Sequence, residues 1–215
     1  YGNKNKPSMV DLYIYELVCR TVREWLERGM TVNPVSCNFS SLHFDSPEFP
    51  ELVAAIADRH NVPHALLELE ITESAIMRNP QIVCAQVLRL KERGFMIAID
   101  DFGSGYSSLG QLQQLMADVL KLDRSFVRRG MFGTRERIVI GNVIHMAGEL
   151  GMQVICEGVE NAKQAEMLIE LGCYYAQGFY YAKPMPRDVF EGLLEKGKVL
   201  QDEKENKKGA WQRKL

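Results

Sequence analysis

Side chains that can do chemistry gather at the ends of short apolar runs in this 215-residue chain. The clearest case is the segment IAIDD, in which Ile97, Ala98 and Ile99 lead into the adjacent carboxylates Asp100 and Asp101. Neighbouring side chains on a strand point to opposite faces, so a simple buried strand does not explain two acids in a row. Further polar side chains end, follow or interrupt the other apolar runs: Asn38, Glu70, Glu73, Lys121, Asp123, Glu157, Glu160 and Gln177.

This set of side chains favours a metal site. Clustered carboxylates repel one another and raise each other's pKa unless cations neutralise them. Oxygen ligands without a histidine or cysteine metal motif select Mg²⁺ or Mn²⁺. Two such ions about 3.5–4 Å apart suit in-line attack on a phosphodiester. We therefore interpret Asp100-Asp101 as a corner at which one carboxylate bridges two ions and its neighbour reaches the second ion.

Each residue also has a purely structural interpretation. A single Asp or Glu at the end of a strand is commonly a helix N-cap or a solvated loop residue, and Asn38 alone fits an Asx turn. Lys121 stands between Leu120 and Leu122, so its side chain must face either water or a cluster of carboxylates. The coincidence of polar groups on six successive apolar runs favours one shared site.

Helix and strand patterns alternate along the whole chain. Helical spacing from Val10 to Trp25, with Gly29 after it, predicts the first helix. Alternation of this kind predicts an α/β protein with a parallel sheet, in which the carboxyl ends of the strands meet at one rim. A TIM-type (β/α)8 barrel has eight strands in about 250 residues, so we expect such a barrel lacking about two N-terminal strands. The expected strands are 32–40, 66–72, 95–100, 119–123, 153–158 and 174–181, and the further helices are 48–60, 81–93, 107–116, 135–150, 161–171 and 186–196.

Composition narrows the class of protein. A chain that is 46% hydrophobic and 25% charged fits one globular domain, which we expect over residues 1–200, with a charged tail over 201–215. The net charge of −2 gives no basic field for duplex nucleic acid. Five cysteines without a CxxC pair predict buried free thiols in a reducing compartment, and we expect no signal peptide or membrane span.

Longer motifs carry a family resemblance. The chain resembles the EAL domain, a cyclic di-GMP phosphodiesterase domain, over nearly its whole length to about residue 195. Order, spacing and residue types all agree. The matching segments are VSCNFS (35–40), LELEITES (67–74), IAIDDFGSGYSSLGQL (97–112), VLKLDRSFV (119–127), GMQVICEGVENAKQ (151–164) and GCYYAQGFYYAKPMP (172–186).

The resemblance implies a role for each polar residue. It implies hydrolysis of one phosphodiester bond of cyclic di-GMP to give linear pGpG, with two Mg²⁺ or Mn²⁺ ions. Lys121 then positions the attacking water, and Glu157 is a general base or a metal-associated acid. The implied metal ligands are Asn38, Glu70, Asp100 and Asp101, the implied substrate-ordering residues are Asp123, Glu160 and Gln177, and Glu73 anchors the loop 102–110.

The sequence departs from the family pattern at its front. The Glu-Ala-Leu signature and a nearby arginine that would contact the ligand phosphate are absent from these residues. Either the sequence omits N-terminal residues of a catalytic domain, which we favour, or the domain is a natural remnant that binds cyclic di-GMP without turnover. A protein-interaction module is a third alternative, and the retained acids argue against it.

The resemblance also carries expectations about the assembly. It implies a homodimer and allows an upstream sensory or GGDEF-type cyclase domain. It further implies a cytoplasmic protein, or the cytoplasmic part of a larger membrane-anchored one.

Overall fold

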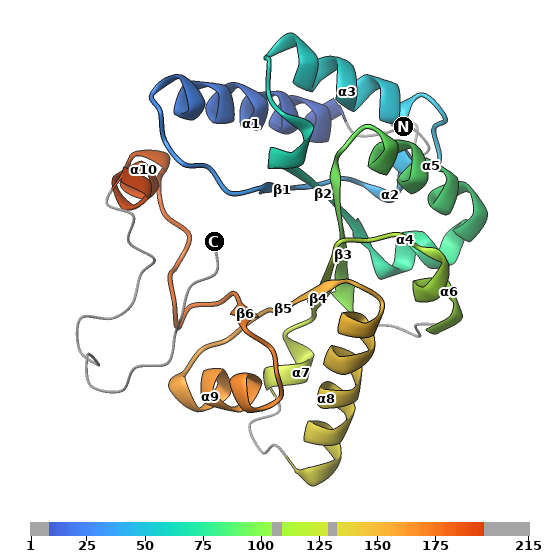
Figure 1. Ribbon diagram of the computed structural model, residues 1–215, viewed down its shortest axis with the longest axis vertical. Helices are drawn as coiled ribbons and strands as arrows, with labels where there is room; N and C mark the ends of the chain where they lie inside the picture. Colours follow the sequence, from blue (N-terminus) through green and yellow to red (C-terminus); the bar gives the residue numbers. More distant parts are fainter. Residues whose placement is uncertain (1–8, 105–108, 129–132, 196–215) are drawn as a thin grey trace, which may run out of the picture.

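A computed structural model describes residues 9–104, 109–128 and 133–195, and it confirms an α/β protein of the barrel type. Six parallel strands pair in chain order into one curled half-barrel, with helices around its outer side (Figure 1). This is the expected TIM-type arrangement with fewer strands than a complete barrel. The strands are β1 (Val35–Asn38), β2 (Leu67–Thr72), β3 (Met96–Phe102), β4 (Val119–Leu122), β5 (Gln153–Cys156) and β6 (Tyr175–Ala176).

Helices separate the strands, as the alternating pattern predicts. Gly29, expected after the first helix, has a positive φ, and so have Gly94, Gly151 and Gly172, which follow three later helices. None of the described helices combines the length and the apolar character that crossing a bilayer requires. The helices are α1 (Met9–Glu27), α2 (Ser41–Phe44), α3 (Phe49–Arg59), the 3₁₀ turn η1 (His64–Leu66), α4 (Glu73–Arg78), α5 (Pro80–Glu92), α6 (Leu109–Gln114), α7 (Ser125–Arg128), α8 (Thr134–Glu149), α9 (Ala162–Glu170) and α10 (Arg187–Glu195).

Strand alternation separates the apolar core from the polar face. On β2, Leu67, Leu69 and Ile71 are fully buried in the core that the helices cover. Glu68 and Glu70 alternate with them and therefore face the inner side of the half-barrel. Because of this alternation, polar side chains of the strands lie on the inner face of the sheet, and apolar side chains lie on the outer face that the helices cover.

Two strands are much shorter than the sequence pattern predicts, and the others differ from it by one or two residues at one or both ends. The expectation of a strand over 174–181 is wrong beyond Ala176, because the chain turns at Gly178, whose carbonyl accepts the amides of Tyr181 and Ala182 at 3.0 and 3.2 Å. A Cβ at Gly178 would lie 2.1 Å from the carbonyl oxygen of Val159, so the turn depends on this close approach. The strand over 32–40 is likewise restricted to β1. The expected tail 201–215 lies outside the described residues.

The cysteines are structural. All five are free thiols, and Cys19, Cys37, Cys156 and Cys173 are buried. Burial raises the pKa of the Cys19 thiol to about 11, so the thiol is protonated at neutral pH. The expectation of free thiols is confirmed, and that of burial is confirmed for four of the five, since Cys84 is only half-buried.

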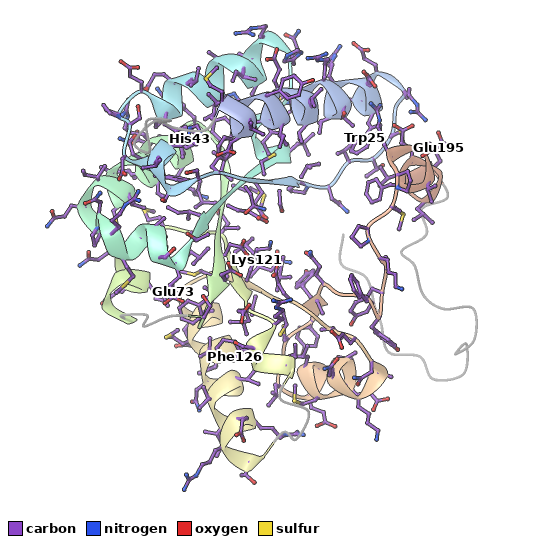
Figure 2. All side chains as sticks on the ribbon, turned by 180° about the vertical axis from the view of Figure 1, so that it is seen from behind. Trp25, His43, Glu73, Lys121, Phe126 and Glu195 are labelled. Atoms are coloured by element: carbon purple, nitrogen blue, oxygen red, sulfur yellow. The ribbon has the colours of Figure 1, made fainter. Side chains whose placement is uncertain are left out.

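Ion pairs dock the last helix onto the first (Figure 2 labels Trp25 and Glu195). The Glu191 carboxylate accepts hydrogen bonds from Trp25 Nε1 at 2.8 Å and Arg28 Nη1 at 2.6 Å. Arg28 also pairs with Glu195 at 2.5 Å, and Arg187 pairs with Glu191 at 2.6 Å. Because no residue of α10 is fully buried, this network contributes much of the docking.

The Glu191 network predicts a pH-dependent stability. Hydrogen bonds from Arg28, Trp25 and Arg187 lower the pKa of Glu191 to about 2. A lowered pKa in the folded state stabilises the fold above the ordinary pKa, and that contribution is lost as the pH falls towards 2. We expect Glu191→Gln to unfold at a lower denaturant concentration than wild type at pH 7, and the difference to shrink below about pH 4.5. Glu27→Gln on α1 is the control, and a difference that stays constant with pH would contradict the prediction.

Candidate active site

Lys121 lies at the centre of a cluster of acids on the inner face of the half-barrel (Figure 2). Its Nζ donates a hydrogen bond to Glu70 Oε1 at 2.6 Å, lies 2.9 Å from Glu157 Oε1 and lies 3.6 Å from Asp100 Oδ1. The side chain of Lys121 is only 7% exposed, and that of Glu70 is 2% exposed. Of the two environments left open by the sequence, the structure therefore places Lys121 among carboxylates.

The charges in this cluster do not balance. Burial raises the pKa of Glu70 and of Glu157, and the pairing of each with Lys121 offsets this only in part. Burial also opposes the charge of Lys121, yet its contacts with Glu70, Glu157 and Asp100 outweigh burial and hold the lysine pKa above its ordinary value. One amine therefore faces three carboxylates, and the excess negative charge calls for a further cation.

A β-bulge explains the doubled acid of β3. Ile99 pairs with Leu120 and Phe102 pairs with Leu122, so Asp100 and Asp101 together lie opposite the single residue Lys121. Asp101 has φ of +56°, a left-handed conformation that aspartate tolerates better than most residues. The bulge thus lets neighbouring side chains point to one site.

The bulged acids fit a divalent cation. One carboxylate oxygen from each of Asp100, Asp101 and Glu157 lies within 4.8 Å of the other two. Asp100 Oδ1 is buried and has no hydrogen-bond partner among the described residues, which leaves its lone pairs available to a cation. Burial raises the pKa of Asp101, and the charge of Asp100 adds to this effect. Hard oxygen donors of this kind suit Mg²⁺ or Mn²⁺.

Asn38 lies beside this cluster on the first strand. It ends β1, is exposed, and is paired in register with Glu70 of β2. Because parallel strands end at the same edge, Asn38 lies at the same rim as the acids.

Glu73 fixes the chain that follows the bulge. As the first residue of α4, Glu73 accepts the Gly103 amide hydrogen bond on Oε2 at 2.7 Å. Gly103 has φ of +88°, and a Cβ there would lie 2.1 Å from the ring of Phe126 (Figure 2 labels Glu73 and Phe126). Gly103 is therefore held between a carboxylate and an aromatic ring. The sequence motif indicated Glu73, but no signal in it indicated the role of Phe126.

The remaining predicted residues lie around this cluster. Asp123 follows β4, and its Oδ1 accepts the Ser125 amide hydrogen bond at 2.8 Å, which is a local capping contact. Gln177 follows β6, and its backbone is tied to Cys156 at 2.9 Å and to Val159 at 3.1 Å. Glu160 is exposed, three residues after Glu157. Within the described chain, the side chains of Asp123 and Gln177 make no hydrogen bond to the Lys121 cluster.

Glu68 was not singled out from the sequence. It is 5% exposed, on the same face of β2 as Glu70, and its Oε1 accepts a hydrogen bond from Ser36 Oγ at 2.6 Å. The two-residue spacing of LELE was the available signal, because it places both acids on one face.

Lys121→Met tests the charge balance of the cluster. The change keeps the volume of the side chain but removes its charge, so we expect the metal-free protein to lose about 3–5 kcal/mol of unfolding free energy. Added Mn²⁺ should recover part of this loss, because the ion replaces the missing positive charge. Denaturant unfolding with and without Mn²⁺ measures both effects. Lys163→Met on the exposed side of α9 is the control, and equal stability of the two variants would contradict the prediction.

Asp101→Val tests the bulge. A β-branched side chain is strained in the left-handed conformation, so we expect a loss of roughly 1–2 kcal/mol in unfolding free energy. Asp101→Asn keeps a side chain that tolerates this conformation and should remain within about 0.5 kcal/mol of wild type in EDTA. Denaturant unfolding separates the two, and equal losses would exclude the bulge as the cause.

Comparisons with known proteins agree with this geometry. A family model for the EAL domain matches residues 6–184. The cyclic di-GMP phosphodiesterase RocR of Pseudomonas aeruginosa is 34% identical over 186 residues, which are 85% of this chain and 47% of RocR. The chain covers between 22% and 47% of eight curated relatives, and so spans less than half the length of each of these.

Solved structures give the same result. The EAL domain of Mycobacterium smegmatis DcpA superimposes with a TM-score of 0.80 at 33% identity, covering 89% of this chain and 86% of that one. The MucR phosphodiesterase in complex with c-di-GMP gives a TM-score of 0.78 at 33% identity, covering 83% and 72%. With its six-stranded half-barrel and its rim of acids, this chain belongs to the EAL domain family.

Proposed function

We propose that this chain is part of a metal-dependent phosphodiesterase that hydrolyses cyclic di-GMP to linear pGpG. The observation that carries the proposal is the convergence of Asp100, Asp101 and Glu157 within 4.8 Å, beside an amine that already pairs with Glu70. RocR is named as a cyclic di-GMP phosphodiesterase, and the MucR structure contains c-di-GMP, which supports the choice of substrate.

The proposed roles follow from the position of each side chain. Asn38, Glu70, Asp100 and Asp101 would hold two Mg²⁺ or Mn²⁺ ions, which polarise a phosphodiester and lower the pKa of a bound water. Lys121 orients the attacking water and offsets negative charge in the transition state. Glu157, whose pKa burial raises, accepts the proton of that water.

The other predicted residues have roles in binding the substrate and in holding the loop 102–110. Asp123, Glu160 and Gln177 order the dinucleotide, and Glu73 anchors the loop 102–110 through Gly103. Residues 105–108 of that loop lie outside the described residues.

The proposal extends to the assembly. We take the active form to be a homodimer that works in the cytoplasm, either free or attached to a membrane anchor. A sensory or GGDEF-type cyclase domain on the same protein is part of the proposal. MucR, named as a bifunctional diguanylate cyclase and cyclic di-GMP phosphodiesterase, supports the last point, with 34% identity over 176 residues.

A cyclic di-GMP receptor without turnover is the second candidate. The two candidates share the binding site and differ only in hydrolysis, so one assay separates them.

The decisive assay incubates the intact protein with cyclic di-GMP in Mg²⁺, Mn²⁺ or EDTA. Chromatography follows pGpG, and calorimetry follows binding. Turnover that requires metal supports the phosphodiesterase, whereas binding without turnover supports the receptor. A folded protein that neither binds nor hydrolyses the dinucleotide contradicts both.

Glu157→Gln tests the proposed base. We expect turnover to fall roughly 10²- to 10⁴-fold, the usual contribution of a positioned general base, while the dinucleotide still binds. Glu166→Gln, on an exposed position of α9, is the matched control and should retain turnover. Near-normal hydrolysis by Glu157→Gln would remove this residue from the mechanism.

A further inference from the structure

We propose that Arg124 binds the phosphodiester group of the cyclic dinucleotide that is not being hydrolysed. This inference rests on the proposed function, because it assigns a partner to the second phosphate of the same substrate. It concerns a residue for which the family resemblance gave no role.

The charge of the ligand calls for a cationic side chain in addition to the metal ions. Cyclic di-GMP carries two phosphodiester groups, each with one negative charge, and only the group at the metal ions is neutralised by them. Lys121 is not available to the second group, because its amine is buried and already faces Glu70, Glu157 and Asp100. An uncompensated phosphate beside this cluster of carboxylates would be repelled.

Arg124 is placed to meet that need. It follows Asp123 at the carboxyl end of β4, and its side chain is exposed. Its side chain makes no hydrogen bond or ion pair with any other residue that the structure describes, while its backbone carbonyl accepts the Val127 amide hydrogen bond at 3.1 Å. Arg124 adjoins Asp123 in the chain at the rim, and its positive charge opposes the effect of burial on the pKa of both Asp101 and Asp123.

The backbone of Arg124 is held in place on two sides. Gly158, with φ of +71°, approaches so closely that a Cβ there would lie 2.4 Å from Arg124 Cβ and 3.2 Å from its Cα. On the other side, the bond from the Ser125 amide to Asp123 Oδ1 at 2.8 Å fixes the turn. Gly158 directly follows Glu157, so the Cα and Cβ atoms of Arg124 are fixed relative to the proposed base. Only the long side chain remains free to reach a ligand.

The chemistry suits a phosphodiester. A guanidinium presents paired N–H donors that match two phosphate oxygens, and it keeps its charge at any physiological pH. The competing explanation is that Arg124 only offsets the charges of Asp101 and Asp123. That explanation predicts a change in stability with no change in ligand affinity, so the two are separable.

The test measures binding of cyclic di-GMP to the intact protein in a Glu157→Gln background, where hydrolysis does not interfere. We expect Arg124→Gln to raise the Kd about 10- to 100-fold, the range for loss of a charge-assisted hydrogen bond, and Arg124→Lys to recover part of it. The Kd of Arg124→Gln should also depend less on salt concentration. In the otherwise wild-type protein, KM should rise more than kcat falls.

Arg59→Gln on α3 is the control, because Arg59 is exposed and pairs only with Glu16 among the described residues. An unchanged Kd with a lowered melting temperature in Arg124→Gln would overturn the inference and support the charge-offset explanation. If the Glu157→Gln protein itself does not bind cyclic di-GMP, the proposed function fails first. The two failures are thus distinguishable.

Discussion

A buried amine held by carboxylates is the constraint on which the site depends. Lys121 and Glu70 are almost completely withdrawn from solvent, and removing two charges from water costs several kcal/mol for each ion. Their pairing recovers this cost only while the geometry is maintained, so neighbouring strands must stay in register. The same cluster leaves negative charge in excess on Asp100, Asp101 and Glu157. Such an excess of buried negative charge is better explained by cation binding than by a contribution of these acids to the stability of the fold.

The fold supplies the geometry in two steps. Parallel strands in chain order bring the ends of β1 to β6 to one rim, so residues far apart in sequence become neighbours. The bulge in β3 then turns Asp101 towards the site that Asp100 already faces. Glu73 and Phe126 hold Gly103 immediately after the bulge, which limits how far the two acids can move. The segment from Asp100 to Gly103 is therefore constrained both by the charges of its acids and by its backbone conformation.

Much of this was predictable from the sequence, and the failures have physical causes. Alternating helix and strand patterns predicted six parallel strands, whereas Glu68, which lies on the same face of β2 as Glu70, was not singled out. The bulge at Asp100-Asp101 was not predictable, because it is a property of the pairing of β3 with β4 and not of either segment. The extent of β6 was wrong for a similar reason: the strand ends where Gly178 meets Val159, a contact between distant residues. The sequence narrowed Lys121 to two environments, and only tertiary structure chose between them.

The central claim is that these acids hold divalent ions, and anomalous scattering from Mn²⁺ in crystals of the intact protein tests it most directly. We expect anomalous peaks within coordination distance of the carboxylates of Asp100 and Asp101. Crystals that hydrolyse cyclic di-GMP but show no Mn²⁺ at these two side chains would contradict it.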